Sequence, residues 1–255
     1  MNSRKKAVWM IAVSVAILVA LVVAKLRHSV PPTCNPNIDA KTVILIDHSE
    51  AVSTQTSEAI IHRAWEFIDQ RVADGERVSV FLLSALSKRD LRPVFSSCKP
   101  RQDGNRTVED IKQLKIRFQK EFRIPLQKEL SRVITGSDES PIAEGLIDLS
   151  LDTHHFVSDK TKLLIFSDFL QNSKALSHYT CVDGSHAVRD FRIARIGSQE
   201  RPQFKNVEVH MHLIPRSVAS RAVLQCRDHF WMWFFGDLTC ASKACLVPLY
   251  LPGNQ

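Results

Sequence analysis

The chain has 255 residues, 44% of them hydrophobic, and only 8 glycines and 11 prolines, which excludes collagen-like and low-complexity classes and predicts a sizeable core. The formal net charge of +7 does not indicate nucleic-acid binding, because residues 1–28 hold five Lys or Arg and no acid. Subtracting those five from seven leaves +2 for the rest of the chain, which predicts no basic stripe for nucleic acid.

The first apolar stretch predicts a membrane anchor. Residues 7–24 are eighteen consecutive residues without a charge, long enough to cross a bilayer. Three basic residues precede the stretch and two follow it, which favours a cytoplasmic amino terminus and an exported main domain. We predict a cytoplasmic stub and single-pass inner-membrane anchor over residues 1–28, a stalk over 29–41, and the main domain in a periplasm or extracellular space. A signal peptide cleaved after residue 24 is the alternative.

Apolar runs predict the strands. Residues 42–46 form an unbroken, mostly β-branched run that is typical of a central strand buried on both faces. Further strands are predicted at residues 77–84, 162–167 and, alternating in polarity as expected toward a sheet edge, 207–213. Pro93 makes the run 91–95 an edge strand, and its short connection to the preceding strand favours antiparallel pairing.

Between these strands, apolar residues recur at spacings of three and four. Helices are therefore predicted around residues 56–73, 111–122, 142–151 and 217–235. This alternation predicts an α/β fold over residues 42–238, with a doubly wound, mostly parallel sheet, one antiparallel edge strand and helices on both faces. Residues 239–255 are predicted to be a C-terminal tail.

Two helical segments have an unusual composition. The segment 112–132 carries seven Lys or Arg, which we interpret as a solvated face, with a surface for anionic lipid or an acidic partner as the alternative. The aromatic cluster at 230–235 is interpreted as packing on the core, and a membrane-dipping surface is its alternative.

The six cysteines follow the predicted export segment, which is typical of a disulfide framework. They are Cys34, Cys98, Cys181, Cys226, Cys240 and Cys245. Six cysteines allow fifteen pairings. If the edge strand returns antiparallel, Cys98 finishes at the end of the sheet where Cys34 enters, so we favour this pair. No pairing is derived for the other four, although Cys240 and Cys245 are close enough to pair locally.

Acidic and hydroxyl residues stand where buried strands end. Asp47 and Ser49 follow the first strand, and Asp168 follows the strand 162–167. Open α/β sheets place ligands at the carboxyl ends of their strands. Ser140 precedes the helix 142–151 as its expected cap. Carboxylate and hydroxyl oxygens are ligands for hard divalent cations, and bonds to backbone N–H groups in local turns are the alternative role.

The sequences Asp47-x-Ser49, Ser140-Pro141 and Ser167-Asp168 resemble the metal-ion-dependent adhesion site of von Willebrand factor type A (vWA) domains, over roughly residues 40–235. The family pattern is Asp-x-Ser-x-Ser, then a Thr often followed by Pro, then an Asp commonly followed by Gly. The resemblance implies four metal ligands. They are Asp47, Ser49, Ser140 and Asp168.

Two positions depart from that pattern. Ala51 replaces the second serine, and Phe169 stands where glycine is usual. Glu50 and Ser53 are the substitute ligands we consider. An intact site of this kind implies Mg²⁺ or Mn²⁺ held directly by the hydroxyls, with a carboxylate from a protein partner completing the coordination.

The leading functional prediction is therefore a membrane-anchored, exported vWA-like module that binds or scaffolds a protein partner and is not an enzyme. A structural subunit of an envelope assembly with a non-functional metal site is the second reading, which Ala51 supports. A metal-dependent hydrolase is the third, and the lack of a nucleophile and base at recognisable spacing counts against it. Two histidine pairs are alternative ligands for a transition metal. They are His154-His155 and His210-x-His212.

Overall fold

The computed structural model describes residues 34–49, 51–84, 91–103, 110–132, 136–137, 139–216, 219–236 and 246–251. The chain divides into two units, residues 1–33 and 34–255, and the described residues all belong to the second. The predicted anchor and most of the predicted stalk lie outside them. Among the described helices, none combines the length and apolar character needed to cross a membrane.

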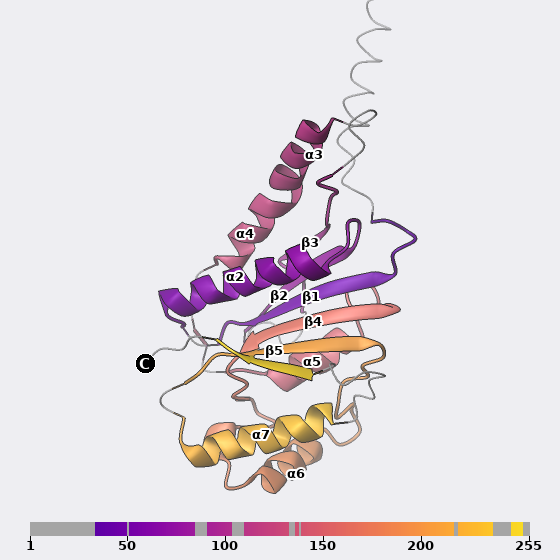
Figure 1. The fold of residues 1–255 in the computed structure, drawn as a ribbon. Helices are drawn as coiled ribbons and strands as arrows, with labels where there is room; N and C mark the ends of the chain where they lie inside the picture. Colours follow the sequence, from indigo (N-terminus) through magenta and orange to yellow (C-terminus); the bar gives the residue numbers. More distant parts are fainter. Residues whose placement is uncertain are drawn as a thin grey trace, which may run out of the picture. The chain divides into compact units, whose positions relative to one another are not determined.

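A six-stranded sheet forms the centre of the domain, in the order β3-β2-β1-β4-β5-β6 (Figure 1). The strands are β1 (Ala40–Asp47), β2 (Arg77–Leu83), β3 (Phe95–Cys98), β4 (Lys160–Ser167), β5 (Val207–Leu213) and β6 (Leu246–Tyr250). Every neighbouring pair is parallel except β2 and β3, which are antiparallel. The predicted mostly parallel sheet with one antiparallel edge strand is confirmed.

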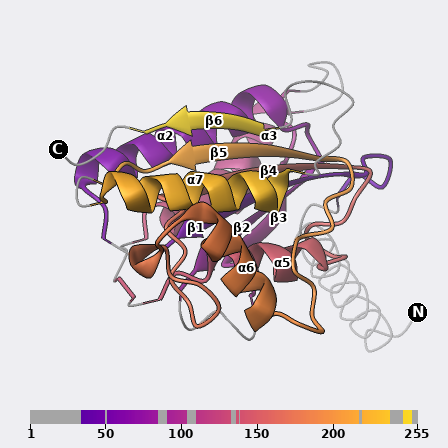
Figure 2. The same ribbon diagram turned by 90° about the horizontal axis from the view of Figure 1, so that it is seen from below.

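Helices cover both faces of this sheet (Figures 1 and 2). One face carries α2 (Thr54–Arg71), α3 (Ile111–Phe118), the π-helical turn η2 (Gln119–Arg123) and α4 (Ile124–Leu130). The other carries α5 (Ile142–Ser150), the short 3-10 turn η3 (His178–Thr180), α6 (Gly184–Ala194) and α7 (Arg221–Phe235). In β1, Val43 and Leu45 face the second layer while Ile44 and Ile46 face the first. Both faces of this strand are buried, which explains its unbroken apolar run.

The boundaries differ from the predictions at three places. β3 begins at Phe95, the residue at which the predicted edge strand ends. β6 lies in the segment predicted to be a tail and pairs with β5, so β5 is not the outer strand. Ser140 does not cap α5, because the cap position is Pro141 and the Gln171 side chain, not a serine hydroxyl, accepts an N–H group of the first helical turn. The Ser140 hydroxyl is instead directed to the site described below.

Two disulfides join distant segments of the domain. Cys34 pairs with Cys98, with the Cα atoms 5.3 Å apart, as favoured from the sequence. Cys181, in the loop before α6, pairs with Cys226 of α7 at a Cα separation of 6.4 Å. Cys240 and Cys245 lie outside the described residues.

The aromatic cluster at 230–235 packs on the core. Phe230, Trp231, Phe234 and Phe235 are buried among the helices of the second layer, while Met232 is 75% exposed. The interpretation of this helix as a core element is therefore confirmed.

A buried ionic network lies at the amino-terminal end of the sheet. Glu76 is 1% exposed, and Lys162 Nζ lies 2.8 Å from its Oε2 atom. The Thr42 hydroxyl donates to Glu76 Oε1 over 2.5 Å. Lys99 donates to the carbonyl oxygens of Ile68 (3.0 Å) and Val72 (2.8 Å) at the C-terminus of α2, where a positive charge is favourable. Glu76, Lys162 and Lys99 therefore each have a polar partner.

Candidate functional site

The candidate site lies where the strand order reverses. The chain leaves β1 toward β2 on one side of the sheet and leaves β4 toward β5 on the other, so the switch point lies between β1 and β4. In open α/β sheets, ligands bind outside the carboxyl ends of the strands at such a point. β1 ends at Asp47, and Asp168 directly follows β4. The topology therefore brings both predicted aspartates to the same edge.

Asp47 is surrounded by hydroxyl and backbone donors. Its side chain is buried, and its Oδ1 atom accepts the backbone N–H of Ser49 over 3.0 Å. Its Oδ2 atom accepts the hydroxyls of Ser140 (3.2 Å) and Ser167 (2.7 Å). The Ser140 hydroxyl is thus bonded to Asp47, as expected of two neighbouring ligands, whereas Ser49 joins the cluster through its backbone N–H. The contribution of Ser167 was not predicted, because this serine is the last residue of a buried strand.

Asp168 is more deeply buried and carries the shifted pKa of the site. Its exposed fraction is 3%, its Oδ1 atom accepts the backbone N–H of Leu170 (2.8 Å), and its Oδ2 atom accepts Arg216 Nε (2.9 Å). Burial, followed by the negative charge of Asp47, raises the pKa of Asp168 to about 6. The bonds from Leu170 and Arg216 act in the opposite direction but do not cancel this rise.

Arg216 occupies the place of a counter-ion. Its guanidinium joins Asp168 to the backbone carbonyl of Ala51, which accepts Nη1 over 3.1 Å. Ala51 is the position where the vWA pattern has its second hydroxyl. Arg216 therefore bridges the end of the first motif and the last aspartate. The sequence gives no signal for this residue, because it lies in the loop after β5 and only the fold brings it here.

Phe169 has the backbone conformation that glycine favours. Its φ angle is 59°, in the left-handed region, where a non-glycine residue costs about 1–3 kcal/mol. The ring is fully buried and lies 5.3 Å from the Trp231 ring, and the Phe169 carbonyl accepts Trp231 Nε1 over 2.7 Å. Packing against α7 thus holds the turn that glycine usually provides in the family pattern.

The loop after β4 is pinned to the start of α5. The backbone N–H of Ser140 donates to the Asn172 carbonyl (2.7 Å), and the N–H of Asn172 donates to the Ser140 carbonyl (3.0 Å). The buried side chain of Gln171 accepts the N–H of Ala143 (2.9 Å) and donates to Glu144 (2.7 Å). These bonds fix the Ser140 hydroxyl relative to Asp47.

The remaining candidate ligands are not brought to this cluster by the described contacts. Ser53 caps α2, where its hydroxyl accepts the N–H of Thr56 over 3.1 Å. Glu50 lies outside the described residues. His210 bonds Glu208 through Nε2 over 2.8 Å, and His212 stacks on Phe166 with ring centroids 4.5 Å apart.

The other histidine pair is likewise explained by local contacts. The rings of His154 and His155 lie 4.5 Å apart, and His155 Nδ1 lies 3.2 Å from the Ser79 hydroxyl. Within the described ranges, no group of three His, Cys, Asp or Glu side chains is arranged to hold a metal ion.

The described residues, as arranged, do not fit a divalent cation. All four carboxylate oxygens of Asp47 and Asp168 accept hydrogen bonds from protein donors. One of those donors is a guanidinium, whose charge repels a metal ion. Hard cations need several oxygen ligands with free lone pairs directed at one point. A cation at this edge would therefore lie beside the positive charge of Arg216.

Comparisons with known proteins give no functional assignment. No protein-family model and no curated protein matches the chain. Proximal thread matrix protein 1 from the mussel byssus is one similar solved structure, with a TM-score of 0.36 and 13% identity, covering 75% of this chain and 42% of that one. An aerotolerance-related membrane protein from Bacteroides fragilis NCTC 9343 is another, with a TM-score of 0.36 and 9% identity, covering 84% of this chain and 92% of that one. This chain thus spans less than half the length of the first.

Proposed function

We propose that this chain is a membrane-anchored, extracytoplasmic protein-binding or scaffolding module built on a vWA-like domain. The observation that carries the proposal is the meeting of Asp47, Ser140 and Asp168 at the switch point of the sheet. This is the place where open α/β sheets bind ligands. The three motifs that resemble the adhesion site share one rim of the sheet, which supports the proposal.

The second part of the proposal is that partner binding at this rim does not depend on a metal. Arg216 supplies a fixed positive charge beside Asp168, where the family pattern would use a cation. An arginine binds carboxylates in a well-defined geometry, so a partner carboxylate can exchange with Asp168 for the guanidinium. The burial of Asp168 beside Asp47 makes its own ion pair with Arg216 easier to replace, since its charged form is disfavoured.

The extracytoplasmic placement is supported by the disulfides. Disulfides persist in oxidising compartments and are rare in the cytosol. Both described pairs, Cys34–Cys98 and Cys181–Cys226, join segments distant in sequence. The anchor itself is proposed from the apolar stretch at residues 7–24.

Partner capture by the full chain tests the first part. The chain is solubilised with its neighbours after crosslinking, and the wild type is compared with Asp47→Asn/Asp168→Asn. The exposed Asp190 of α6 provides the control, as Asp190→Asn. We expect the site variant to lose crosslinked partners that the wild type and the control retain. Equal recovery by all three would move the interface away from the strand ends.

Calorimetric titration with Mg²⁺ and Mn²⁺ tests the second part. We expect no binding heat at millimolar ion for the wild type, because Arg216 pairs with Asp168. Arg216→Ala removes the guanidinium and leaves both aspartates, so heat in this variant alone would identify Arg216 as the group that excludes the ion. Submillimolar binding by the wild type would overturn the metal-free proposal and favour a functional Mg²⁺ or Mn²⁺ site.

A structural subunit of an envelope assembly is the second candidate. It is favoured by the absence of a side-chain hydroxyl at Ala51, whose backbone carbonyl binds Arg216 instead. Such a subunit would keep its neighbours in Asp47→Asn/Asp168→Asn and lose them only when the domain unfolds. The hydrolase alternative gains no support from the described site.

A further inference from the structure

The segment α3–η2–α4 has two apolar faces. One face, with Phe118, Phe122 and Leu126, is buried in the core cluster beside α2 and β3. The other face is not covered to the same extent, because Ile116 is 37% exposed and Ile124 is 61% exposed. A helix that needs only one face for packing therefore presents a second apolar strip outward.

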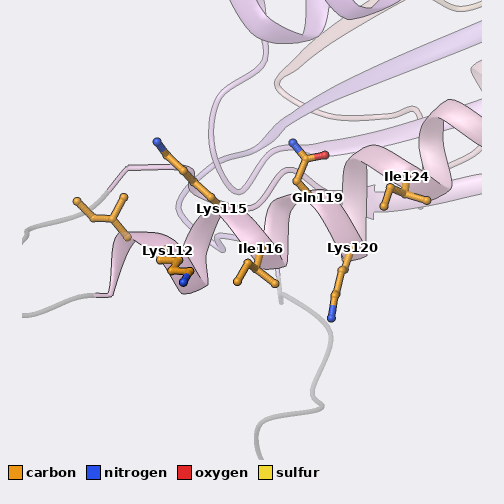
Figure 3. Close-up of a pocket in the computed structure, with 7 residues that line it drawn as sticks. Lys112, Lys115, Ile116, Gln119, Lys120 and Ile124 are labelled. Carbon is orange, nitrogen blue, oxygen red and sulfur yellow. The ribbon is translucent and has the colours of Figure 1, made fainter.

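Lysines lie within and beside this second strip. Lys112, Lys115 and Lys120 are exposed and line the same hollow as the isoleucines (Figure 3). Figure 3 shows Lys115 leaving one side of the helix and Lys112 and Lys120 the other. The described residues that line the hollow include no acid, and the acid within η2, Glu121, is paired with Arg117 at 2.9 Å. The strip thus combines apolar side chains with lysines for which the described residues show no ion pair.

The covalent structure limits how far this strip can lie from the proposed anchor. Nine residues, 25–33, separate the apolar stretch 7–24 from Cys34, and they extend at most about 30 Å. Cys34 is bonded to Cys98, and α3 begins thirteen residues after Cys98 at Ile111. In Figure 1, α3 projects away from the sheet rather than lying over its centre.

We propose that the α3–η2 surface, defined by Lys112, Lys115, Ile116, Lys120 and Ile124, docks on the anionic phospholipid surface of the membrane that holds the anchor. Helices that lie in a membrane interface pair an apolar strip with Lys and Arg, and each basic residue adds attraction to anionic headgroups. The inference rests on the anchor in the proposed function but not on partner capture at the strand ends. Docking would hold the domain in one orientation on the membrane.

The test uses the full chain in lipid nanodiscs of phosphatidylcholine, with or without phosphatidylglycerol. Hydrogen–deuterium exchange is measured over residues 111–124. We expect these amides to be protected more strongly in anionic discs than in zwitterionic discs. In Lys115→Glu/Lys120→Glu the extra protection should fall by about tenfold or more, because each lysine near an anionic surface contributes about fivefold to binding. The control Lys174→Glu/Lys205→Glu changes the charge equally at two exposed positions and should behave as the wild type.

A second pair of variants tests the apolar part. Ile116→Ser/Ile124→Ser should lose the protection, whereas Ile193→Ser/Ile196→Ser should not, although Ile193 and Ile196 are 57% and 77% exposed. Unchanged exchange in β1 and β4 shows that each variant is folded.

Equal exchange of residues 111–124 in both kinds of disc would overturn the proposal and leave an acidic protein or residues 1–33 as the occupant. Retention of the chain in the discs reports the anchor separately. If the chain is not retained, the same exchange is measured with anionic vesicles, and absence of protection there overturns the proposal equally.

Discussion

Buried charged groups have different partners at the two ends of the sheet. At the amino-terminal end, one carboxylate, Glu76, meets one ammonium group, Lys162, and the Thr42 hydroxyl bonds the carboxylate as well. At the carboxyl end, two carboxylates lie close together, and in the described contacts only Asp168 bonds a guanidinium, that of Arg216, while Asp47 bonds hydroxyl and backbone donors. Buried charges are stable only when they are paired and hydrogen-bonded. The amino-terminal end meets this requirement, whereas the carboxyl end retains a carboxyl group whose pKa is raised to about 6.

We relate this difference to two roles, with the amino-terminal end contributing to stability and the carboxyl end to the proposed function. Groups with strongly shifted pKa values concentrate at functional sites, because such sites keep charges that folding alone would remove. We therefore expect substitutions at the amino-terminal end to change the free energy of unfolding strongly, and substitutions at the carboxyl end to change its pH dependence.

The largest expected effect is at Lys162. Lys162→Met leaves Glu76 buried without its cation, so the free energy of unfolding should fall by about 3–5 kcal/mol. Urea unfolding of the full chain in detergent measures this loss. Lys160→Met, on the same strand but exposed, is the matched control and should change stability by less than about 0.5 kcal/mol. A loss below 1 kcal/mol for Lys162→Met would show that the amino-terminal end does not depend on this pair.

The next effect concerns the disulfide at the same end. The Cys34–Cys98 bond closes a segment of 64 residues, so Cys34→Ser/Cys98→Ser should lower the free energy of unfolding by about 2–4 kcal/mol. Non-reducing urea unfolding against the wild type measures the change. The pH dependence of stability should stay as in the wild type, because the substituted residues lie far from the titrating groups in the sheet topology. An altered pH dependence would contradict the separation of the two ends.

Much of this sheet could be predicted from the sequence. The residues of β1, β2, β4 and β5 are apolar runs or alternations whose period identifies strands, and the helices that alternate with them indicate parallel pairing. β6 (Leu246–Tyr250) was not predicted, because its five residues include a proline. The helix that precedes it, α7, was predicted, but no strand was predicted to follow that helix. Proline in a strand is tolerated at a sheet edge, where β6 lies.

The acidic and hydroxyl residues of the site could be predicted from the sequence, whereas its counter-ion could not. Asp47 and Asp168 stand at the carboxyl ends of two predicted parallel strands, so the sequence pattern predicts that they lie at the same edge of the sheet. Arg216 follows no motif, since a counter-ion from a distant loop is recognised only once the fold is known. A local rule predicts Ser140 as a helix cap and the family resemblance predicts it as a ligand beside Asp47; the hydroxyl bonds Asp47, 93 residues away in sequence, and does not cap the helix. Local rules cannot weigh such tertiary alternatives.

A smaller effect should appear when His212, near the carboxyl end of β5, is replaced. The ring is 3% exposed, and neither ring nitrogen has a hydrogen-bond partner in the part of the chain that the structure describes. Burial, then the charges of His210 and Arg63, lower the pKa of His212 to about 4. The folded state therefore disfavours protonation of His212. The contribution of the neutral His212 ring to the free energy of unfolding is complete above pH 6.5 and is lost as the pH falls toward 4.

His212→Phe keeps the stacking on Phe166 and removes the titration. Between pH 8 and pH 5, the wild type should lose about 2 kcal/mol more than this variant, as measured by urea unfolding at both pH values. His62→Gln, at an exposed position of α2, should keep the pH dependence of the wild type. If His212→Phe keeps it as well, the ring is not buried as described.

The smallest effect is expected from Asp168, whose pH dependence should be opposite to that of His212. It tests the carboxyl end of the sheet most directly. Its raised pKa means that the folded state favours the protonated carboxyl, so this group stabilises the fold at low pH and the contribution is lost as pH rises through about 6. Asp168→Asn removes the titrating group and the repulsion from Asp47 together. Its stability relative to the wild type should therefore rise by about 1 kcal/mol between pH 5 and pH 8. Asp190→Asn, exposed on α6, should show no such rise. If the stability of Asp168→Asn relative to the wild type fell between pH 5 and pH 8, the ion pair with Arg216 would fully stabilise the charged form of Asp168. The carboxyl end would then resemble the amino-terminal end, where the buried carboxylate is paired.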